Sequence, residues 1–345
     1  MTFSTTPVLS LCLPTYKRCA LLGGALRAVL EQITPTLAPD VEVIVLDNAS
    51  PDDTQAVIGR VRADFPDILL HSFRHPENVG ADANFIEAVR QSRGEFVYLL
   101  SDDDILLPGA VARLISLIRA HPDMDAFAVN VREFLHSTDE EATSFFKLDG
   151  DLILRDRDQA LILLNTILTF MSCLVFRRET VAARDYADKV GTLLVQAFFF
   201  VDALAPECGL YVTRETYLAK RADNHQGYRF FQIFLTHFDL IMDYALQAGY
   251  SPAAVRRTLT EHLKFLRYCV LLFKQNGAIG TIRPDYRDGL ARLWRVYGPH
   301  PFALGIVATM MLMPAPLFRG MHRVYKRVKA VVRPAPAMST QSGPR

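Results

Sequence analysis

The segment EFVYLLSDDDILLP, residues Glu95–Pro108, decides the fold of this 345-residue chain. An apolar run of strand character ends abruptly in three consecutive carboxylates, Asp102, Asp103 and Asp104, and a Pro-Gly turn and a helical pattern follow. Three adjacent acids repel one another, so a chain that places them at the end of a buried strand generally supplies a cation for them. The plainer alternative is a solvated turn in which an aspartate caps the next helix. The flanking sequence favours the cation.

The same alternation of strand and helix occurs three times upstream of this segment. Strand-like runs over 8–13, 41–46 and 68–73 each precede a stretch with helical spacing. This order predicts an α/β fold with a mostly parallel, Rossmann-like sheet and helices on both faces. In such sheets ligands bind beyond the carboxyl ends of the strands. The polar stretches that follow the strands, 15–18, 47–53 and 101–104, therefore predict a binding cleft.

The second half of the chain has a different pattern. The regular alternation stops near residue 125, and a region follows in which we expect an acceptor to dock. It contains strand-like runs over 126–129 and 209–212, apolar segments over 167–176 and 195–204, and a basic, polar loop over 216–229. Helical periodicity returns from residue 230 and predicts a C-terminal helical region.

An apolar and then basic segment closes the chain. Residues 302–318 carry no charge, but Pro314 and Pro316 interrupt them, and the stretch is short for a bilayer span. Basic residues follow at Arg319, Arg323, Lys326, Arg327, Lys329 and Arg333. This pattern fits an interfacial or re-entrant anchor on an anionic cytoplasmic leaflet, and the alternative is a core helix with a solvated basic end.

Composition limits the classes of function. The 38 Lys and Arg residues nearly balance the 37 Asp and Glu residues, so no overall field favours a nucleic-acid partner. The five cysteines are scattered without a C-x-x-C pair, which predicts reduced thiols, and residues 1–7 show no secretory signal. Half of the residues are hydrophobic. We therefore expect a cytoplasmic protein that associates peripherally with the inner face of the cytoplasmic membrane.

Four motifs in order resemble a known family. They are Pro14-Thr15-Tyr16, the run Val45–Ser50, Asn78-Val79-Gly80 with Asn84, and the run Leu100–Leu106. Together they resemble the inverting GT-A glycosyltransferases of family 2, and the Ser-Asp-Asp-Asp version looks most like the abequosyltransferase-like branch. The resemblance is close over residues 8–120 and loose over 125–235.

The resemblance implies a role for each matched position. The nucleotide pocket would be lined by Pro14, Thr15, Tyr16 and Arg18. Asp47 would accept a hydrogen bond from the base, and Asp102 would bind the ribose hydroxyls. Asp82 and Asn84 would face the base or the ribose. Asp103 and Asp104 would hold Mn²⁺ or Mg²⁺ on the donor diphosphate. His225 would add a metal or phosphate contact, although a lone loop histidine is commonly just solvated. Arg221 would clamp the diphosphate. Hard carboxylate oxygens suit such a cation, which neutralises the leaving group.

Two positions depart from the family pattern. Most members have Asp where this chain has Ser101. Inverting members usually carry a Glu-Asp pair, the general base, about ten residues before a glycine. Counting back from Gly209 reaches Gln196–Phe198, which holds no carboxylate. Asp202 is the nearest acid and the candidate base, with a helix-surface aspartate as its alternative; Asp185 and Asp188 are more distant options.

The expected activity is the metal-dependent, inverting transfer of a hexose from a nucleoside diphosphate to a lipid-linked or surface-polysaccharide glycan. UDP is the first candidate for the nucleotide, and CDP, GDP and dTDP are the alternatives. We expect a nucleotide-sugar-binding half over 1–124, an acceptor-binding half over 125–234, a helical region over 235–300, a membrane-associated segment over 301–333 and a disordered tail over 334–345.

A rival hypothesis is a membrane-associated scaffold that kept the fold and lost the base. A sugar-nucleotide pyrophosphorylase is disfavoured because the loop after the first strand lacks glycine. A phospho-acceptor signalling domain would not need the second half.

Overall fold

A computed structural model describes residues 6–134, 138, 144–205, 209–221, 229–279, 282–297 and 301–332, without the side chains of 301–303 and 324–332. His225, Cys208 and the tail over 334–345 lie outside the described residues.

The first half is a parallel sheet built from alternating strands and helices, as the sequence predicts. Its strands are β1 (Leu9–Thr15), β2 (Val41–Asp47), β3 (Leu70–Arg74) and β4 (Phe96–Leu99), and its helices are α1 (Cys19–Leu30), α2 (Thr54–Asp64), α3 (Ala81–Gln91) and α4 (Ala110–Ala120). β2 lies between β1 and β3, and β1 lies between β2 and β4, all in parallel register. Every residue of β1, β2 and β4 is buried, which explains why their sequences are continuous apolar runs.

The second half adds strands to the same sheet. They are β5 (Ile105–Leu106), β6 (Ala126–Phe134), β7 (Leu152–Leu154), β8 (Leu174–Arg177) and β9 (Leu210–Arg221), with helices α5 (Arg157–Leu164), α6 (Arg178–Ala182) and α7 (Val195–Leu204). Within the described part of the chain, nine strands form one sheet in the order β3-β2-β1-β4-β8-β6-β9-β5, and β7 also pairs with β9. β8 is antiparallel to both β4 and β6, so the sheet is mixed beyond β4.

One expectation for this half is wrong. The sequence predicted a loop from residue 216, but β9 continues as a strand to Arg221. Its polar residues pair with β6 on one side and with β5 on the other. Pairing on both sides satisfies the backbone of a segment whose side chains alone resemble a loop.

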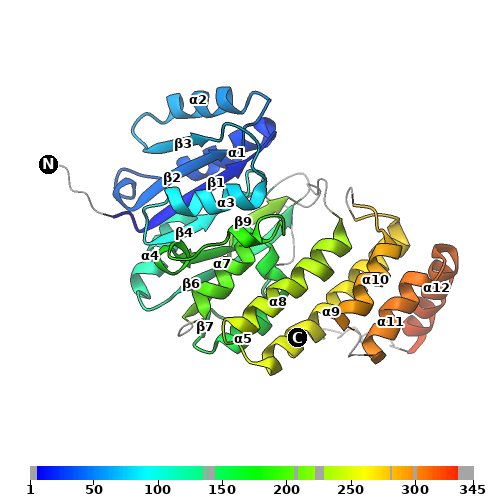
Figure 1. The fold of residues 1–345 in the computed structure, drawn as a ribbon. Coiled ribbons are helices and arrows are strands. Elements are labelled where there is room, and N and C mark those ends of the chain that lie inside the picture. The colour runs from blue at the N-terminus through cyan, green and yellow to red at the C-terminus, as the bar shows by residue number, and fades with distance from the viewer. Residues whose placement is uncertain are drawn as a thin grey trace, which may run out of the picture.

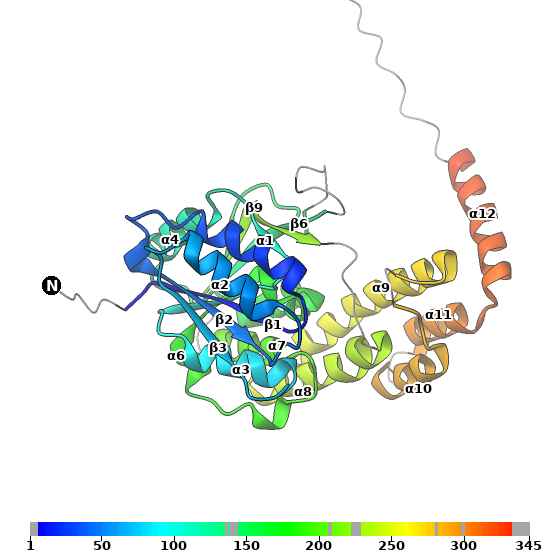
Figure 2. The same cartoon turned by 90° about the horizontal axis from the view of Figure 1, so that it is seen from above.

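Helices cover both faces of the sheet. Figure 2 shows α1 and α4 on one side of the strands and α3 and α6 on the other. α7 lies with α3 and α6 and is buried along its whole length, which explains its apolar sequence. The main hydrophobic core joins residues of both halves.

The C-terminal region is helical, as predicted, and Figure 1 shows it extending from one end of the sheet. It contains a π-helical turn (Gln232–His237), α8 (Phe238–Gln247), α9 (Pro252–Asn276), α10 (Tyr286–Tyr297), α11 (Pro301–Leu312) and α12 (Ala315–Val332). Ser251 caps the start of α9 through the backbone N–H of Ala254, and Gly277 ends the helix with a φ of 84°. These helices share a second hydrophobic core.

The apolar segment near the C-terminus forms two helices with a sharp bend between them. None of the described helices is by itself long and apolar enough to cross a membrane, whereas the pair 304–312 and 315–323, bent by 114°, passes that test of length and composition together. Pro314 lies in the break, where proline cannot continue a helical hydrogen-bond ladder. The buried ammonium of Lys274 donates to the carbonyls of Met311 and Met313, each at 2.8 Å, and so caps the end of α11.

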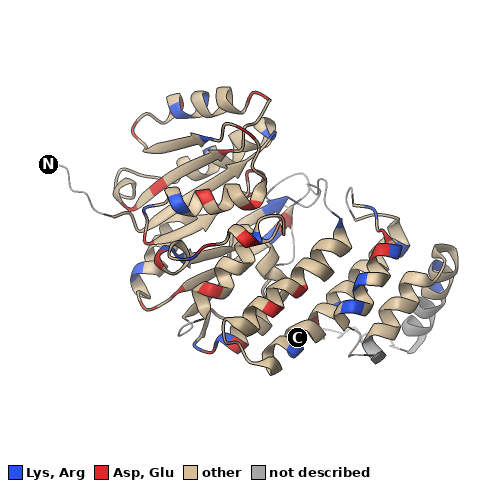
Figure 3. Ribbon diagram, in the orientation of Figure 1, with Lys and Arg blue, Asp and Glu red and all other residues tan. Residues whose placement is uncertain are grey.

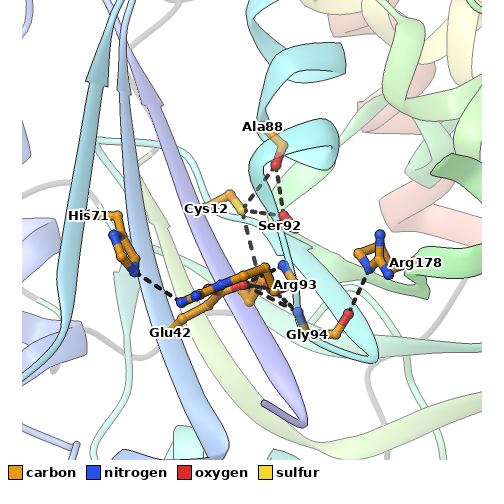
Figure 4. A network of polar contacts seen from close by, with 9 residues as sticks. Cys12, Glu42, His71, Ala88, Ser92, Arg93, Gly94 and Arg178 are labelled. Carbon is orange, nitrogen blue, oxygen red and sulfur yellow. Dashed lines mark hydrogen bonds and ion pairs between the residues drawn. The ribbon is translucent and has the colours of Figure 1, made fainter. Parts of the chain in front are cut away.

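A polar network ties the amino ends of the central strands together (Figure 4). The buried carboxylate of Glu42 accepts from the Ser10 hydroxyl at 2.6 Å, from the Arg93 guanidinium at 3.0 Å and from the Gly94 N–H at 3.2 Å. These bonds lower the pKa of Glu42 against the opposing effect of burial. The network holds the turn between α3 and β4 against β1 and β2, at the edge opposite the predicted cleft.

This packing predicts that Gly94→Ala destabilises the protein. A Cβ at this position would lie 2.7 Å from the Ser10 backbone nitrogen and 2.9 Å from the Leu9 carbonyl carbon. These backbone atoms would have to move, which costs free energy. We expect a loss of about 2 kcal/mol in the free energy of unfolding, measured by urea denaturation. Gly24→Ala is the matched control, because nothing lies within 4 Å of its Cβ and alanine favours the helix. Equal effects of the two substitutions would contradict this account.

Candidate functional site

Hydrogen bonds and ion pairs join the carboxyl ends of β1 and β4. The Thr15 hydroxyl donates to one Asp102 oxygen at 2.6 Å, and the Arg18 guanidinium donates to the other at 2.9 Å. Arg18 also lies 3.5 Å from an Asp103 oxygen. Burial raises the pKa of Asp102 to about 6, although Arg18 and Thr15 oppose the shift. Direct contacts therefore link four of the residues predicted to share a site: Thr15, Arg18, Asp102 and Asp103.

The other two carboxylates of the run face a cavity. Asp103 accepts from the Ser101 hydroxyl, and Asp104 accepts from the backbone N–H of Arg221 at 3.2 Å. The second Asp104 oxygen is buried and has no hydrogen-bond partner among the described residues. Burial, and then the charge of Asp103, raise the pKa of Asp104 to about 7. A bound cation would relieve both costs.

The loop after β2 lies beside this cluster and is tightly hydrogen-bonded. Asp47 is fully buried and accepts from the Ser50 N–H at 2.8 Å and from the Gln55 amide at 2.6 Å, and Arg74 lies 3.6 Å away. The Ser50 hydroxyl in turn accepts from the Lys17 N–H at 2.9 Å. These bonds join the loops that follow β1 and β2.

The loop after β1 supplies the remaining residues of the first motif. Pro14 is buried within β1, whereas the Tyr16 side chain is 41% exposed. Lys17 and Ala49, one in each loop, have φ angles of 55° and 58°, which non-glycine residues rarely adopt. Such backbone occurs where the surrounding structure fixes the loop, and it is frequent at binding sites.

Asp82 and Asn84 point into the protein rather than into the cavity. The Asp82 carboxylate accepts from the backbone N–H groups of Gly191, Leu193 and Val195, at 2.8, 2.8 and 3.1 Å. The Asn84 amide donates to the Leu46 carbonyl at 3.1 Å. In this structure Asp82 fixes the loop that leads into α7, and the nucleotide contacts expected of both residues remain predictions.

The cavity at this edge has a volume of about 790 Å³. Its polar end is lined by Arg18, Ser101, Asp103, Asp104, Glu133, Lys220 and Arg221. Lys220 pairs with Glu133 at 2.7 Å and lies 6.0 and 5.8 Å from the rings of Phe145 and Phe170. Sequence reasoning missed Glu133, Phe145 and Phe170 as wall residues, because no motif marks them. The pairing of β6 with β9 places Glu133 beside Lys220, and the Phe145 N–H donates to the Val131 carbonyl of β6 at 2.9 Å.

The residues near the predicted base position do not line this cavity. The hydroxyls of Tyr186, which is buried, and of Tyr244, which is half-buried, both donate to Asp202 at 2.7 Å, and Arg184 lies 3.5 Å away. Gln196 donates to the Thr169 carbonyl at 3.0 Å, and its amide oxygen is buried without a partner among the described residues. The catalytic role of Asp202 remains a prediction.

The described residues contain no group of three or more His, Cys, Asp or Glu side chains placed to hold a metal ion. Asp103 and Asp104 nevertheless fit a hard cation, because one buried Asp104 oxygen lacks a partner and both groups border the cavity. Mg²⁺ and similar ions commonly take one or two protein carboxylates and complete their shell with water and substrate phosphates. These residues therefore suit a cation that arrives with a phosphorylated ligand.

Comparison with known families decides the class of protein. The model of glycosyl transferase family 2 matches residues 10–183, which contain Thr15, Arg18 and the carboxylates Asp102–Asp104. The chain belongs to glycosyl transferase family 2. It is therefore a glycosyltransferase with a GT-A fold, and the family resemblance found in the sequence is confirmed.

Two relatives show where the similarity is concentrated. An abequosyltransferase of Salmonella typhimurium is 25% identical over 231 residues, which are 63% of this chain and 67% of the relative. GalNAc(5)-diNAcBac-PP-undecaprenol beta-1,3-glucosyltransferase of Campylobacter jejuni is 35% identical over 109 residues, which are 32% of this chain and only 34% of that relative's length.

Solved structures share the fold. TarS of S. aureus, residues 1–349 in complex with UDP-GlcNAc, has a TM-score of 0.62 at 16% identity and covers 93% of this chain and 92% of its own. The mannosyltransferase PcManGT of Pyrobaculum calidifontis, in complex with GDP-Man and Mn²⁺, has a TM-score of 0.54 at 15% identity and covers 94% and 89%. Because these similarities extend over nearly the whole chain, the C-terminal helices belong to the shared architecture.

The geometry predicts that Asp202→Asn mainly destabilises the protein. Loss of the charge weakens the hydrogen bonds from Tyr186 and Tyr244 and the contact with Arg184, so we expect the free energy of unfolding to fall by about 2 kcal/mol. Asp188→Asn, at a carboxylate whose side chain is 71% exposed, is the control. Urea denaturation measures both. An Asp202→Asn protein as stable as the wild type that had lost turnover would instead support the role as general base.

Proposed function

We propose that this protein transfers a sugar, a hexose, from a nucleoside diphosphate to a glycan on a lipid carrier, with a divalent metal and with inversion at the anomeric carbon. The observation that carries the proposal is the Thr15–Arg18–Asp102–Asp103 cluster at the carboxyl edge of the sheet, beside an Asp104 oxygen that is buried and without a hydrogen-bond partner in the described structure. Direct displacement needs a site that stabilises a leaving diphosphate, and paired carboxylates with a hard cation supply that.

Each residue of the cluster has a role in this proposal. Asp102 binds the ribose hydroxyls, and Asp103 and Asp104 hold Mn²⁺ or Mg²⁺ against the diphosphate. Arg18 and Arg221, which both line the cavity, add positive charge for the phosphates, and His225 supplies a further contact. Pro14, Thr15 and Tyr16 line the nucleotide pocket, Asp47, Asp82 and Asn84 support or face the base, and UDP is the first candidate because UDP-GlcNAc occupies the TarS structure.

We also propose a division of labour along the chain. Residues 1–124 bind the nucleotide sugar, 125–234 bind the acceptor, and 301–333 rest on the inner face of the cytoplasmic membrane. Leu312, Leu317 and Met321 support the last point, because they are 69, 56 and 55% exposed around the bend between α11 and α12. The Campylobacter relative is named for an undecaprenol-linked glycan, which supports a lipid-linked acceptor here.

A non-catalytic binding protein is the second candidate, and a specific observation favours it. Gln196 occupies the region in which the family resemblance implies a carboxylate base, and Asp202 is engaged by two tyrosines. Such a protein would bind the nucleotide sugar without turnover. Release of nucleoside diphosphate in the presence of a membrane-extracted lipid-linked glycan separates the two candidates.

The donor site is tested by isothermal titration of the full chain with UDP, CDP, GDP and dTDP, each with and without Mn²⁺. We expect one nucleotide to bind in a Mn²⁺-dependent manner, and Asp103→Ala to weaken that binding at least about tenfold, the equivalent of 1.4 kcal/mol. Asp123→Ala is the control, because the Asp123 side chain is 61% exposed and pairs with Arg155 on the surface. Binding of no nucleotide by folded protein would overturn the proposal.

The site also predicts a pH dependence. In the free protein the pKa of Asp104 is raised to about 7, so this group carries a proton below that pH and must release it to bind a cation. Affinity for the nucleotide with Mn²⁺ should therefore rise with pH up to about 7 and then level off. Calorimetry at pH 6 in buffers of different ionisation enthalpy should show net proton release on binding. Proton uptake, or no pH dependence between 5.5 and 7.5, is the result that the account does not allow.

A further inference from the structure

The cavity beside the carboxylates has an apolar end that the donor nucleotide does not explain. Beyond Lys220 its wall is mainly apolar, formed by side chains that include Phe145, Phe170, Phe234, Phe265, Leu272 and Ile282, with Thr166 and Thr169 as its polar members. A nucleoside diphosphate needs hydrogen-bond donors and cations, and a long glycan needs polar partners for its hydroxyls. This end offers few of either.

One helix supplies a continuous stripe of this wall. Phe265, Tyr268, Cys269 and Leu272 of α9 follow the spacing i, i+3, i+4, i+7, so they lie on one face of the helix. The ring of Phe234, which also lines the cavity, packs directly against that of Phe265, with 5.2 Å between the ring centroids. None of these four side chains of α9 is charged, which suits a hydrocarbon chain better than a phosphate.

The same helix connects the cavity with the exposed apolar bend. Leu266, Val270 and Phe273 of α9 pack in one core with Leu304, Val307 and Met311 of α11. Lys274, at the end of α9, holds the carbonyls of Met311 and Met313 just before α12 begins. α9 thus lies between the apolar end of the cavity and the surface proposed to rest on the membrane.

Charge at the junction fits an anionic head group. Lys220 lies close to the rings of Phe145 and Phe170 and pairs with Glu133 at 2.7 Å. Arg18 and Arg221 line the same cavity and add positive charge there. A hydrocarbon that carries a phosphate would place its chain against the apolar wall and its phosphate near Lys220.

We propose that the hydrocarbon chain of the acceptor's lipid carrier lies inside this cavity, against Phe265, Leu272 and Ile282, with its phosphate near Lys220. This rests on the proposed transfer to a lipid-linked acceptor and narrows its substrate class. One cavity of about 790 Å³ holds both the carboxylate end and the apolar wall, so the accepting hydroxyl stands close to the lipid phosphate.

The test titrates the full chain calorimetrically with farnesyl phosphate below its micelle concentration, and separately with inorganic phosphate. We expect saturable, one-to-one binding of farnesyl phosphate and at least about 100-fold weaker binding of inorganic phosphate. Leu272→Glu should weaken the binding of farnesyl phosphate at least about tenfold, because it places a charge against the hydrocarbon chain of the ligand. Leu246→Glu is the control, because Leu246 is 40% exposed on α8 and does not line the cavity.

Titration with UDP and Mn²⁺ in every variant reports whether the donor site is intact. Tyr268→Glu is a second cavity variant; this side chain is 57% exposed, so the substitution does not disrupt the core. Farnesyl phosphate that fails to bind the wild type, or that binds both cavity variants as it binds the wild type, overturns the inference while the donor proposal stands. Farnesyl phosphate binding without nucleotide binding would sink the donor proposal and leave the lipid cavity in place.

Discussion

The structure depends on one constraint, the burial of three adjacent carboxylates at the end of a central strand. Arg18 and Thr15 compensate Asp102, and Arg18 also approaches Asp103, so β1 and β4 are joined through charges rather than only through their ladder. Asp104 keeps one buried oxygen without a partner in the described structure, and its pKa is raised. An arrangement that is incompletely neutralised by the protein is costly in the free state and favourable once a cation binds. The carboxylates that would bind the cation therefore destabilise the free protein locally.

The rest of the fold makes that cost tolerable. The sheet carries buried residues on both faces, and its opposite edge is fixed by Glu42, which holds Ser10, Arg93 and Gly94 in one network. Positively and negatively charged residues are interspersed over the ribbon in Figure 3, so the concentration of acids at the site is local and not part of a general field. The Glu42 network thus stabilises one edge of the sheet, and the costly carboxylates lie at the other edge.

Sequence reasoning could predict the first half because its signals are local. Apolar runs that end in polar turns fix the four parallel strands, and parallel strands bring Thr15, Asp47 and Asp102 to one edge. The second half was less predictable because its order comes from long-range pairing. The strand nature of Thr216–Arg221 depends on β5 and β6, and the apolar wall formed by Phe145, Phe170 and Phe265 depends on contacts between distant segments. The environment of Asp202 depends likewise on Tyr186 and Tyr244, neither of which belongs to a motif.

The central claim is that Asp103 and Asp104 bind a divalent cation together with a donor diphosphate. Electron paramagnetic resonance of Mn²⁺, titrated into the protein with and without the nucleotide that binds, tests it most directly. Because the described residues supply fewer than three grouped ligands, we expect Mn²⁺ to bind weakly alone and tightly with the nucleotide, and Asp103→Ala to abolish that gain. Mn²⁺ binding that is unaffected by the nucleotide, or that survives in Asp103→Ala, would contradict it.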